Sequence, residues 1–253
     1  MRGFARMLIL FCHIIFLMEL TLGIAKIKKY AVSESGDTLE FIERPGGGLS
    51  VVLVDGQRSG RGAKRISNKV AGKVVSLLAE GIRDGAAARA VSDYLFHERG
   101  GKVTATLNII SADLITKTIV ITRNNPAPVF VAQSGAFNVL DDPADSIGVR
   151  MNTRPVIYEL PFEAGVAVLA YTDGVTHAGS RSGRKLNVMG EFEMLLDRGC
   201  SAQEIADAIL ERAMNLDEGR PADDISVAVL KVNDFDGDEV RRVSVSLPLG
   251  PLI

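Results

Sequence analysis

Residues 51–63 read Val51-Val52-Leu53-Val54-Asp55-Gly56-Gln57-Arg58-Ser59-Gly60-Arg61-Gly62-Ala63. Four apolar residues, three of them β-branched, run directly into Asp55-Gly56 and a glycine-rich turn. This pattern predicts a buried strand, a tight turn and a helix that leaves the turn. The strand would carry the carboxylate of Asp55 to a sheet edge, where a buried charge is costly unless a cation meets it. The first question is therefore which cation neutralises Asp55.

The composition of the chain is that of a folded protein with one sizeable core. Of its 253 residues, 47% are hydrophobic and 24% are charged, and the formal net charge is -2. A near-neutral chain has no general attraction to nucleic acid, so no nucleic-acid partner is expected. Two cysteines without metal-ligand spacing indicate a reducing compartment, and we expect a cytoplasmic protein.

Residues 1–25 stand apart in the sequence. Two arginines precede an apolar run over residues 8–18, and Glu19 ends this run before the roughly 20 residues that a membrane helix needs. Three interpretations stay open: a signal-like segment, a membrane-associated segment, and a mis-assigned start with Met18 as the working start. From Met18 onward, apolar and other residues alternate as in a half-buried strand. Any membrane association is expected through residues 1–25 only, and residues 26–253 form one predicted domain.

Strand patterns and pairs of helices follow one another along the rest of the chain. Strands are predicted over residues 20–27, 39–42, 49–54, 103–110, 118–122, 129–132, 156–160, 166–171, 225–232 and 240–247. Apolar spacings of three and four predict helices over residues 59–82, 86–99, 191–196 and 202–215, with Ser201 and Glu204 as a capping box. This order predicts an α+β fold in which two antiparallel sheets stack as a sandwich with helix pairs outside.

Aspartates recur at the ends of these strands, namely Asp37, Asp55, Asp173 and Asp223, with Asp224 beside the last. Gathered carboxylates repel one another unless divalent cations neutralise them, and oxygen ligands favour Mg²⁺ or Mn²⁺. Glycine at Gly56 would let a backbone carbonyl face an ion as well. Two such ions can activate a water and polarise a phosphoryl oxygen. For any single aspartate, a plain Asx turn is the alternative.

Four short motifs carry a family resemblance. Thr172-Asp173-Gly174 follows an apolar strand, Asp223-Asp224-Ile225-Ser226 opens another, and Asp55-Gly56 comes after Gly36-Asp37. In this order and at these intervals the motifs resemble those of the PPM (protein phosphatase 2C) superfamily, best in its SpoIIE-like bacterial branch. The resemblance covers roughly residues 27–232.

The resemblance implies a helix-flanked β-sandwich, spanning residues 26–253, that removes phosphate from phosphoserine or phosphothreonine on a protein. Carried over by position, Asp55 would bridge two Mn²⁺ or Mg²⁺ ions and the Gly56 carbonyl would hold one of them. Asp173 and Asp223 would bind the second ion, with Asp224 as a less favoured ligand. Asp37 would hold water bound to an ion, and an activated water would attack phosphorus in line.

The chain departs from the family pattern at three places, one of which, Asn124-Asn125 in place of a Gly-His, has no functional explanation. Arg58 stands where the family usually has glycine, either as a solvated turn residue or as a cation that grips the substrate phosphate. His177 stands where many relatives carry glutamate, either as a surface residue or as a general acid. The compact chain resembles RsbX-type enzymes, so the expected partner is a phosphoprotein of the STAS-domain stressosome or anti-sigma kind.

Two other functions compete with this interpretation. A binding module on the same fold without activity would be expected to have lost a metal carboxylate, whereas every such position is acidic here. A nucleotide-binding protein is suggested by the glycine-rich turn. The turn does not match a Walker A motif, however, because Ala63 precedes Lys64 and Arg65 follows it.

Overall fold

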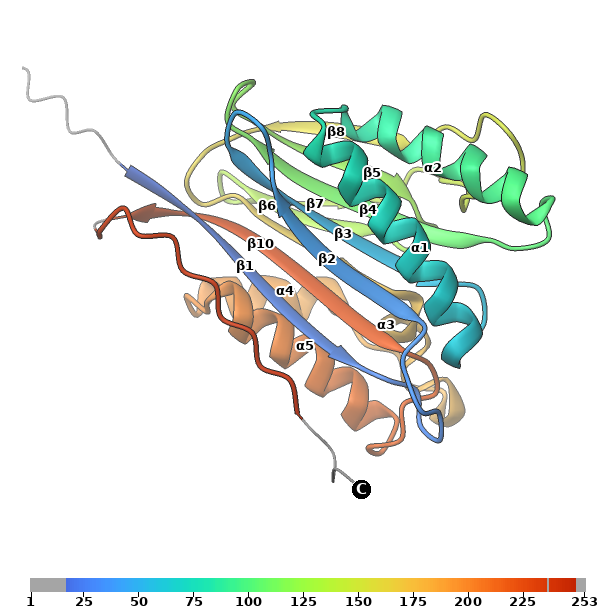
Figure 1. The fold of residues 1–253 in the computed structure, drawn as a ribbon. Coiled ribbons are helices and arrows are strands. Elements are labelled where there is room, and N and C mark those ends of the chain that lie inside the picture. The colour runs from blue at the N-terminus through green and yellow to red at the C-terminus, as the bar shows by residue number, and fades with distance from the viewer. Residues whose placement is uncertain (1–16, 236, 249–253) are drawn as a thin grey trace, which may run out of the picture.

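Ten strands in the computed structural model, which describes residues 17–235 and 237–248, form two five-stranded antiparallel sheets packed face to face (Figure 1). The first sheet has the order β1 (Leu17–Ile27), β10 (Ile225–Phe235), β9 (Ala167–Tyr171), β6 (Val129–Gln133) and β7 (Ala136–Leu140). The second has the order β2 (Asp37–Glu43), β3 (Gly48–Gly56), β4 (Ala105–Asp113), β5 (Thr118–Asn124) and β8 (Val156–Pro161). The predicted α+β sandwich is confirmed.

Helices cover the outer face of each sheet (Figure 1). The long helices α1 (Gly60–Ala79) and α2 (Asp84–Arg99) pack on the second sheet, where Val70 and Val74 join Val52 and Val54 in one apolar cluster. The helices α4 (Val188–Asp197) and α5 (Ala202–Leu216) pack on the first sheet, beside a short helix α3 (Asp173–His177) and a 3₁₀ turn (Ser180–Ser182). Ser201 and Glu204 form the predicted capping box at the start of α5.

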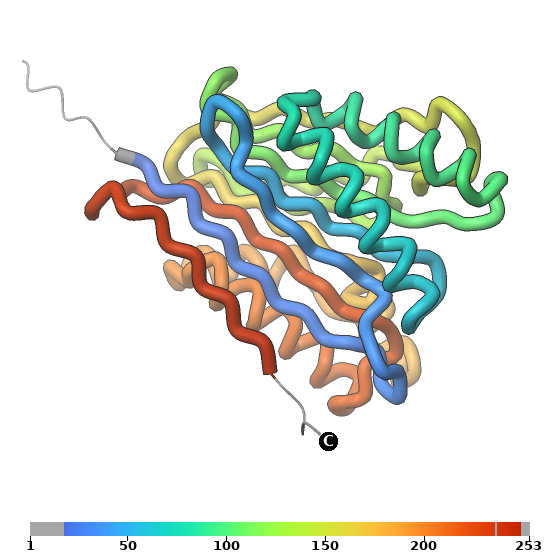
Figure 2. The backbone as a smooth tube through the Cα atoms, in the orientation of Figure 1, coloured from blue at the N-terminus to red at the C-terminus, as the bar shows by residue number. Residues whose placement is uncertain are grey.

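Strands from opposite ends of the described chain lie side by side. β1 pairs with β10 from Leu17↔Phe235 to Ile27↔Ile225, as the tube in Figure 2 shows. The strand predicted from residue 20 is therefore confirmed, and the predicted division between residues 25 and 26 falls inside it. Residues 1–16, on which the interpretations of the first segment depend, lie outside the described residues. No helix within residues 17–235 and 237–248 combines the length and apolarity needed to cross a membrane.

The strand predicted over residues 240–247 is wrong. These residues have no regular secondary structure, and the side chains of Val243, Val245 and Leu247 are at least 69% exposed. An alternating pattern becomes a strand only where a neighbouring edge accepts its hydrogen bonds and a core covers its apolar face. The first sheet ends at β1, but residues 240–247 form no strand pairing with that edge and their side chains stay exposed. Arg241 instead contacts Glu43.

Candidate active site

The ends of β2, β3, β9 and β10 bring the predicted aspartates together. Asp37 at the start of β2 is the register partner of Asp55 near the end of β3. Asp173 follows β9, and Asp223 precedes β10. The side chains of Asp55, Asp173 and Asp223 line an open pocket of about 430 Å³, together with Gly56, Arg58, Asp224 and Lys29. Every site residue predicted from the sequence, except the buried Asp37, therefore lines this one pocket.

Asp37 lies behind the pocket with no exposed surface. One carboxylate oxygen, Oδ2, accepts hydrogen bonds from Ser226 Oγ at 2.7 Å and from Thr172 Oγ1 at 3.0 Å. Burial raises the pKa of Asp37 to about 6, although these two hydrogen bonds oppose the rise. The other oxygen, Oδ1, is buried and has no hydrogen-bond partner among the described residues. A buried lone pair of this kind suits a water molecule or an ion.

The pKa of Asp55 is raised further than that of Asp37. Burial raises the pKa of Asp55 to about 9, and the neighbouring carboxylates of Asp37, Asp173 and Asp223 contribute to the rise. Burial likewise raises the pKa of Asp173. Burial is the main cause of these raised pKa values and repulsion between the carboxylates adds to it, and divalent cations would reverse both effects by favouring the ionised forms. The donor set therefore fits hard divalent ions.

Two lysines contact the backbone of Asp37, and neither contact was predicted from the sequence. The Nζ atoms of Lys26 and Lys64 both donate to the backbone carbonyl of Asp37, at 2.6 and 2.8 Å. Burial, followed by the charge of Lys64, lowers the pKa of Lys26 to about 8. The sequence shows only that Lys26 lies in the alternating pattern of β1 and that Lys64 lies near the start of α1. Their contacts with Asp37 depend on long-range packing.

Asp224 lines the pocket, but its carboxylate is already used by the backbone. Oδ1 accepts from the amide of Lys29 and Oδ2 from the amide of Gly36, both at 2.8 Å. These bonds tie the loop between β1 and β2 to the start of β10. We therefore leave Asp224 out of the proposed ligand set and keep Asp223.

Two cations stand at the rim. Lys29 Nζ lies 3.9 Å from Asp223 Oδ1, and Arg58 is an exposed residue of the turn after β3. The backbone of Arg58 has φ +76°, in the left-handed region that favours glycine. This conformation explains why glycine is usual there in the resembling family, and it costs a non-glycine residue about 1 kcal/mol.

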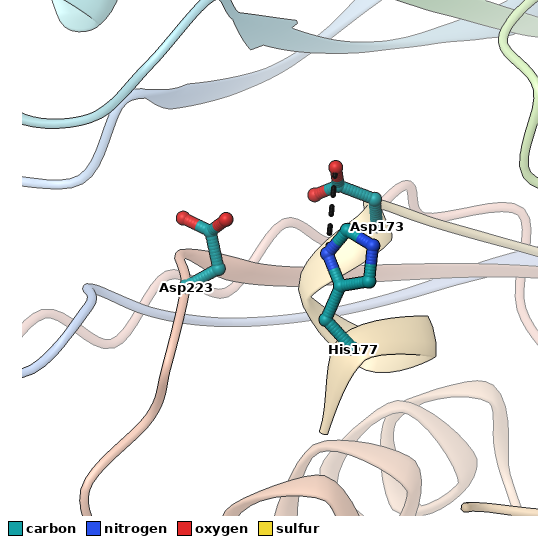
Figure 3. A group of neighbouring side chains, drawn as sticks. All are labelled: Asp173, His177 and Asp223. Atoms are coloured by element: carbon teal, nitrogen blue, oxygen red, sulfur yellow. Dashed lines mark ion pairs between the residues drawn. The ribbon is translucent and has the colours of Figure 1, made fainter. Parts of the chain in front are cut away.

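His177, the last residue of α3, faces Asp173, the first, across one helical turn (Figure 3). Its Nδ1 lies 3.7 Å from Asp173 Oδ2. With Asp223, these residues offer one ligand atom each within 4.8 Å of one another. The site thus contains an imidazole as well as carboxylates.

Comparison with solved structures defines the class of the fold. The chain is similar to the PP2C phosphatase domain of SpoIIE from Bacillus subtilis with a fragment of its regulatory domain (TM-score 0.71, 19% identity, 87% of this chain and 65% of that chain). It is also similar to the serine/threonine phosphatase PstP with two manganese ions (TM-score 0.64, 15% identity, 86% and 100%). A third similar structure is RsbX with magnesium (TM-score 0.66, 14% identity, 86% and 100%). The fold is that of a PP2C-like phosphatase domain.

The family follows from the sequence. Residues 45–233 match the family model described as Stage II sporulation protein E (SpoIIE), so the chain belongs to the SpoIIE family. Stage II sporulation protein E of Priestia megaterium is 21% identical over an alignment of 232 residues, and the match covers 88% of this chain. The chain spans 38% of the length of that relative. The resemblance inferred from the sequence motifs is confirmed.

Proposed function

We propose that the chain is a metal-dependent protein phosphatase that hydrolyses phosphoserine or phosphothreonine on a signalling protein with an activated water. The observation that carries this proposal is the convergence of Asp55, Asp173 and Asp223, from separate strand ends, on one open pocket. Burial and the neighbouring carboxylates together raise the pKa of Asp55, and a carboxylate in such surroundings suits a site that binds cations.

In this proposal Asp55, the Gly56 carbonyl, Asp173 and Asp223 would hold two divalent ions, with Asp55 contributing to both. Ions held there would lower the pKa of a bound water and neutralise charge on the phosphoryl oxygens. Asp37 accepts a hydrogen bond from water through its free Oδ1, because Ser226 and Thr172 fix its other oxygen. Arg58 and Lys29 bind the phosphate from the rim, where both line the pocket.

The open pocket suits a phosphorylated side chain on a protein surface better than a small molecule enclosed on all sides. We propose a STAS-domain protein of a stressosome or anti-sigma pathway as the substrate. Support comes from the similarity of the fold to RsbX, and the choice of substrate can fail without affecting the proposed chemistry.

The test is phosphate release from p-nitrophenyl phosphate and from a serine-phosphorylated STAS-domain protein. We expect turnover with Mn²⁺ or Mg²⁺, none in EDTA, and a loss of about 10³-fold in kcat for Asp55→Asn and Asp173→Asn. Asp113→Asn is the matched control, because Asp113 also ends a strand but only accepts turn amides from Ile115 and Thr116.

Activity that persists in EDTA, or an inactive wild type, would contradict the enzyme and favour a binding module on the same fold. Turnover of the aryl phosphate without turnover of the STAS-domain phosphoprotein would contradict only the proposed substrate.

A further inference from the structure

His177 does not line the pocket, but it lies next to two residues that do, Asp173 and Asp223, and the proposed function gives it no role. His177 lies on the same face of α3 as Asp173, four residues earlier, and both side chains face Asp223 from the loop before β10 (Figure 3). In the resembling family this position often holds glutamate, so an imidazole here replaces an oxygen donor by a nitrogen donor. The question is whether that nitrogen reaches the ion.

The distances permit it. Bonds of about 2.1 Å place two donor atoms on one ion at most roughly 4.2 Å apart. His177 Nδ1 and Asp173 Oδ2 are 3.7 Å apart, within this limit, and the complete group of three lies within 4.8 Å. Asp173 and His177 side chains are 45% and 56% exposed, so small rotations are unobstructed by packing. The group needs only a slight contraction to share one ion.

Within residues 17–235 and 237–248, the imidazole of His177 forms no hydrogen bond. At 3.7 Å its contact with Asp173 is longer than a hydrogen bond. A histidine that served only to hold Asp173 would be expected to donate a bond of normal length. The half-exposed ring instead stands beside two carboxylates with its nitrogen turned toward them (Figure 3).

We propose that His177 is a nitrogen ligand of the ion held by Asp173 and Asp223. This ligand would make that ion site selective for a transition-metal ion such as Mn²⁺ over Mg²⁺. The inference rests on the proposed function, because it assigns a third protein ligand to the ion held by Asp173 and Asp223. The chemical reason is that carboxylates and water suit Mg²⁺, whereas imidazole strengthens the binding of transition metals.

The test is electron spin-echo envelope modulation of Mn²⁺ bound to the full chain without a histidine tag. We expect ¹⁴N modulation from a coordinated imidazole in the wild type and its loss in His177→Gln. The Kd for Mn²⁺ should rise about tenfold in that variant, with a smaller change for Mg²⁺. His97→Gln is the matched control, because His97 lies on α2 with its ring against Phe96, and it should keep the signal.

A second variant, His177→Glu, restores a carboxylate. It should bind Mn²⁺ without ¹⁴N modulation and show a smaller ratio of Mg²⁺ to Mn²⁺ Kd than the wild type. Bound Mn²⁺ without ¹⁴N modulation in the wild type would overturn the role of His177 and leave the phosphatase proposal standing. The same holds for modulation that persists in His177→Gln. A wild type that binds no Mn²⁺ would overturn both.

Discussion

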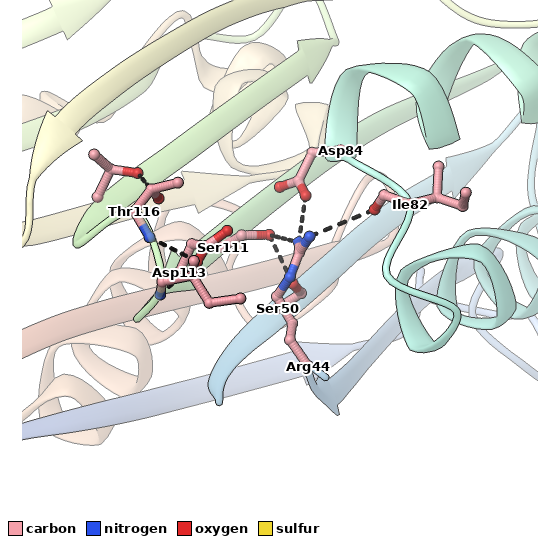
Figure 4. A network of polar contacts seen from close by, with 9 residues as sticks. Arg44, Ser50, Ile82, Asp84, Ser111, Asp113 and Thr116 are labelled. Carbon is pink, nitrogen blue, oxygen red and sulfur yellow. Dashed lines mark hydrogen bonds and ion pairs between the residues drawn. The ribbon is translucent and has the colours of Figure 1, made fainter. Parts of the chain in front are cut away.

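The two ends of the strand pair β2–β3 bury charge in opposite ways. At one end Asp37 is paired with Asp55. At the other, Arg44 follows β2 and lies among Ser50, Ser111 and Asp84 (Figure 4). Asp37, Arg44 and Asp84 are shielded from water, since the Arg44 and Asp84 side chains are 8% and 4% exposed and Asp37 has no exposed surface, whereas Asp55 lines the open pocket.

The two ends of the β2–β3 pair differ in whether a buried charged side chain meets a side chain of opposite charge. The Arg44 guanidinium contacts the Asp84 carboxylate and donates to Ser50 Oγ and Ser111 Oγ, both at 3.1 Å. At the Asp37 end, carboxylate faces carboxylate, and the pKa of Asp55 rises to about 9. A buried charge that is matched internally holds the fold together, whereas an unmatched excess of one sign is typical of a site for an external ligand.

The matched end gives the largest expected effect on stability. Asp84→Ala leaves Arg44 buried without its counter-charge and should lower the free energy of unfolding by about 3 kcal/mol. Urea unfolding followed by circular dichroism measures this change. The double variant Arg44→Met/Asp84→Leu should recover most of the loss, because it removes both charges together. A loss below about 1 kcal/mol in Asp84→Ala would mean that this ion pair does not hold α2 to the second sheet.

The pH dependence of stability at the Asp37–Asp55 end should be opposite to that of a carboxylate whose pKa is lowered by folding. The folded pKa of Asp55 is above its unfolded value, so the folded state holds an extra proton between about pH 4 and pH 9. Stability without metal therefore falls as pH rises through this window, by on the order of 2 kcal/mol from pH 5 to 8 after allowance for partial exposure. Asp37 acts in the same direction, while Lys26, with its lowered pKa, acts in the opposite direction above about pH 8.

Urea unfolding in EDTA at pH 5 and pH 8 measures this dependence, and Asp55→Asn isolates the part due to Asp55. The variant should be more stable than the wild type at pH 8 and should have the flatter profile. Mn²⁺ should stabilise the wild type at pH 8 and the variant much less. If the free energy of unfolding depends on pH equally in the two proteins, the Asp55 carboxylate does not destabilise the metal-free fold.

The same contrast explains how far the sequence alone could predict the molecule. Apolar runs that end in Asp-Gly are local signals, and they predicted the sandwich and the aspartates at its strand ends. The partners of Arg44, Lys26 and Lys64 come from distant residues, and no local pattern encodes them. Residues 240–247 show the same limit. Their alternating pattern is a local property of the sequence, whereas pairing with a sheet edge depends on residues far away in the chain. The helix α3 was missed because Asp173-Gly174 alone reads as a turn.

The smallest predicted effect concerns Arg58, at the rim of the unmatched end. If its guanidinium binds the substrate phosphate, Arg58→Gly should raise KM for the phosphoprotein about tenfold with little change in kcat. In the same variant the free energy of unfolding should rise by about 1 kcal/mol, because glycine adopts φ +76° without strain. Arg58→Ala should raise KM equally but gain no stability, and this difference separates the charge from the backbone.

Arg61→Ala is the control for Arg58, since Arg61 is an exposed arginine of the same turn-helix junction, 3.9 Å from Glu34. It should leave both KM and stability nearly unchanged. A stabilised Arg58→Gly with unchanged KM would identify Arg58 as a solvated turn residue. Lys29, 3.9 Å from Asp223, would then be the remaining rim cation in reach of a phosphate. The stabilisation of Arg58→Gly is expected on either outcome, so KM alone decides whether the chain keeps a strained arginine for its charge.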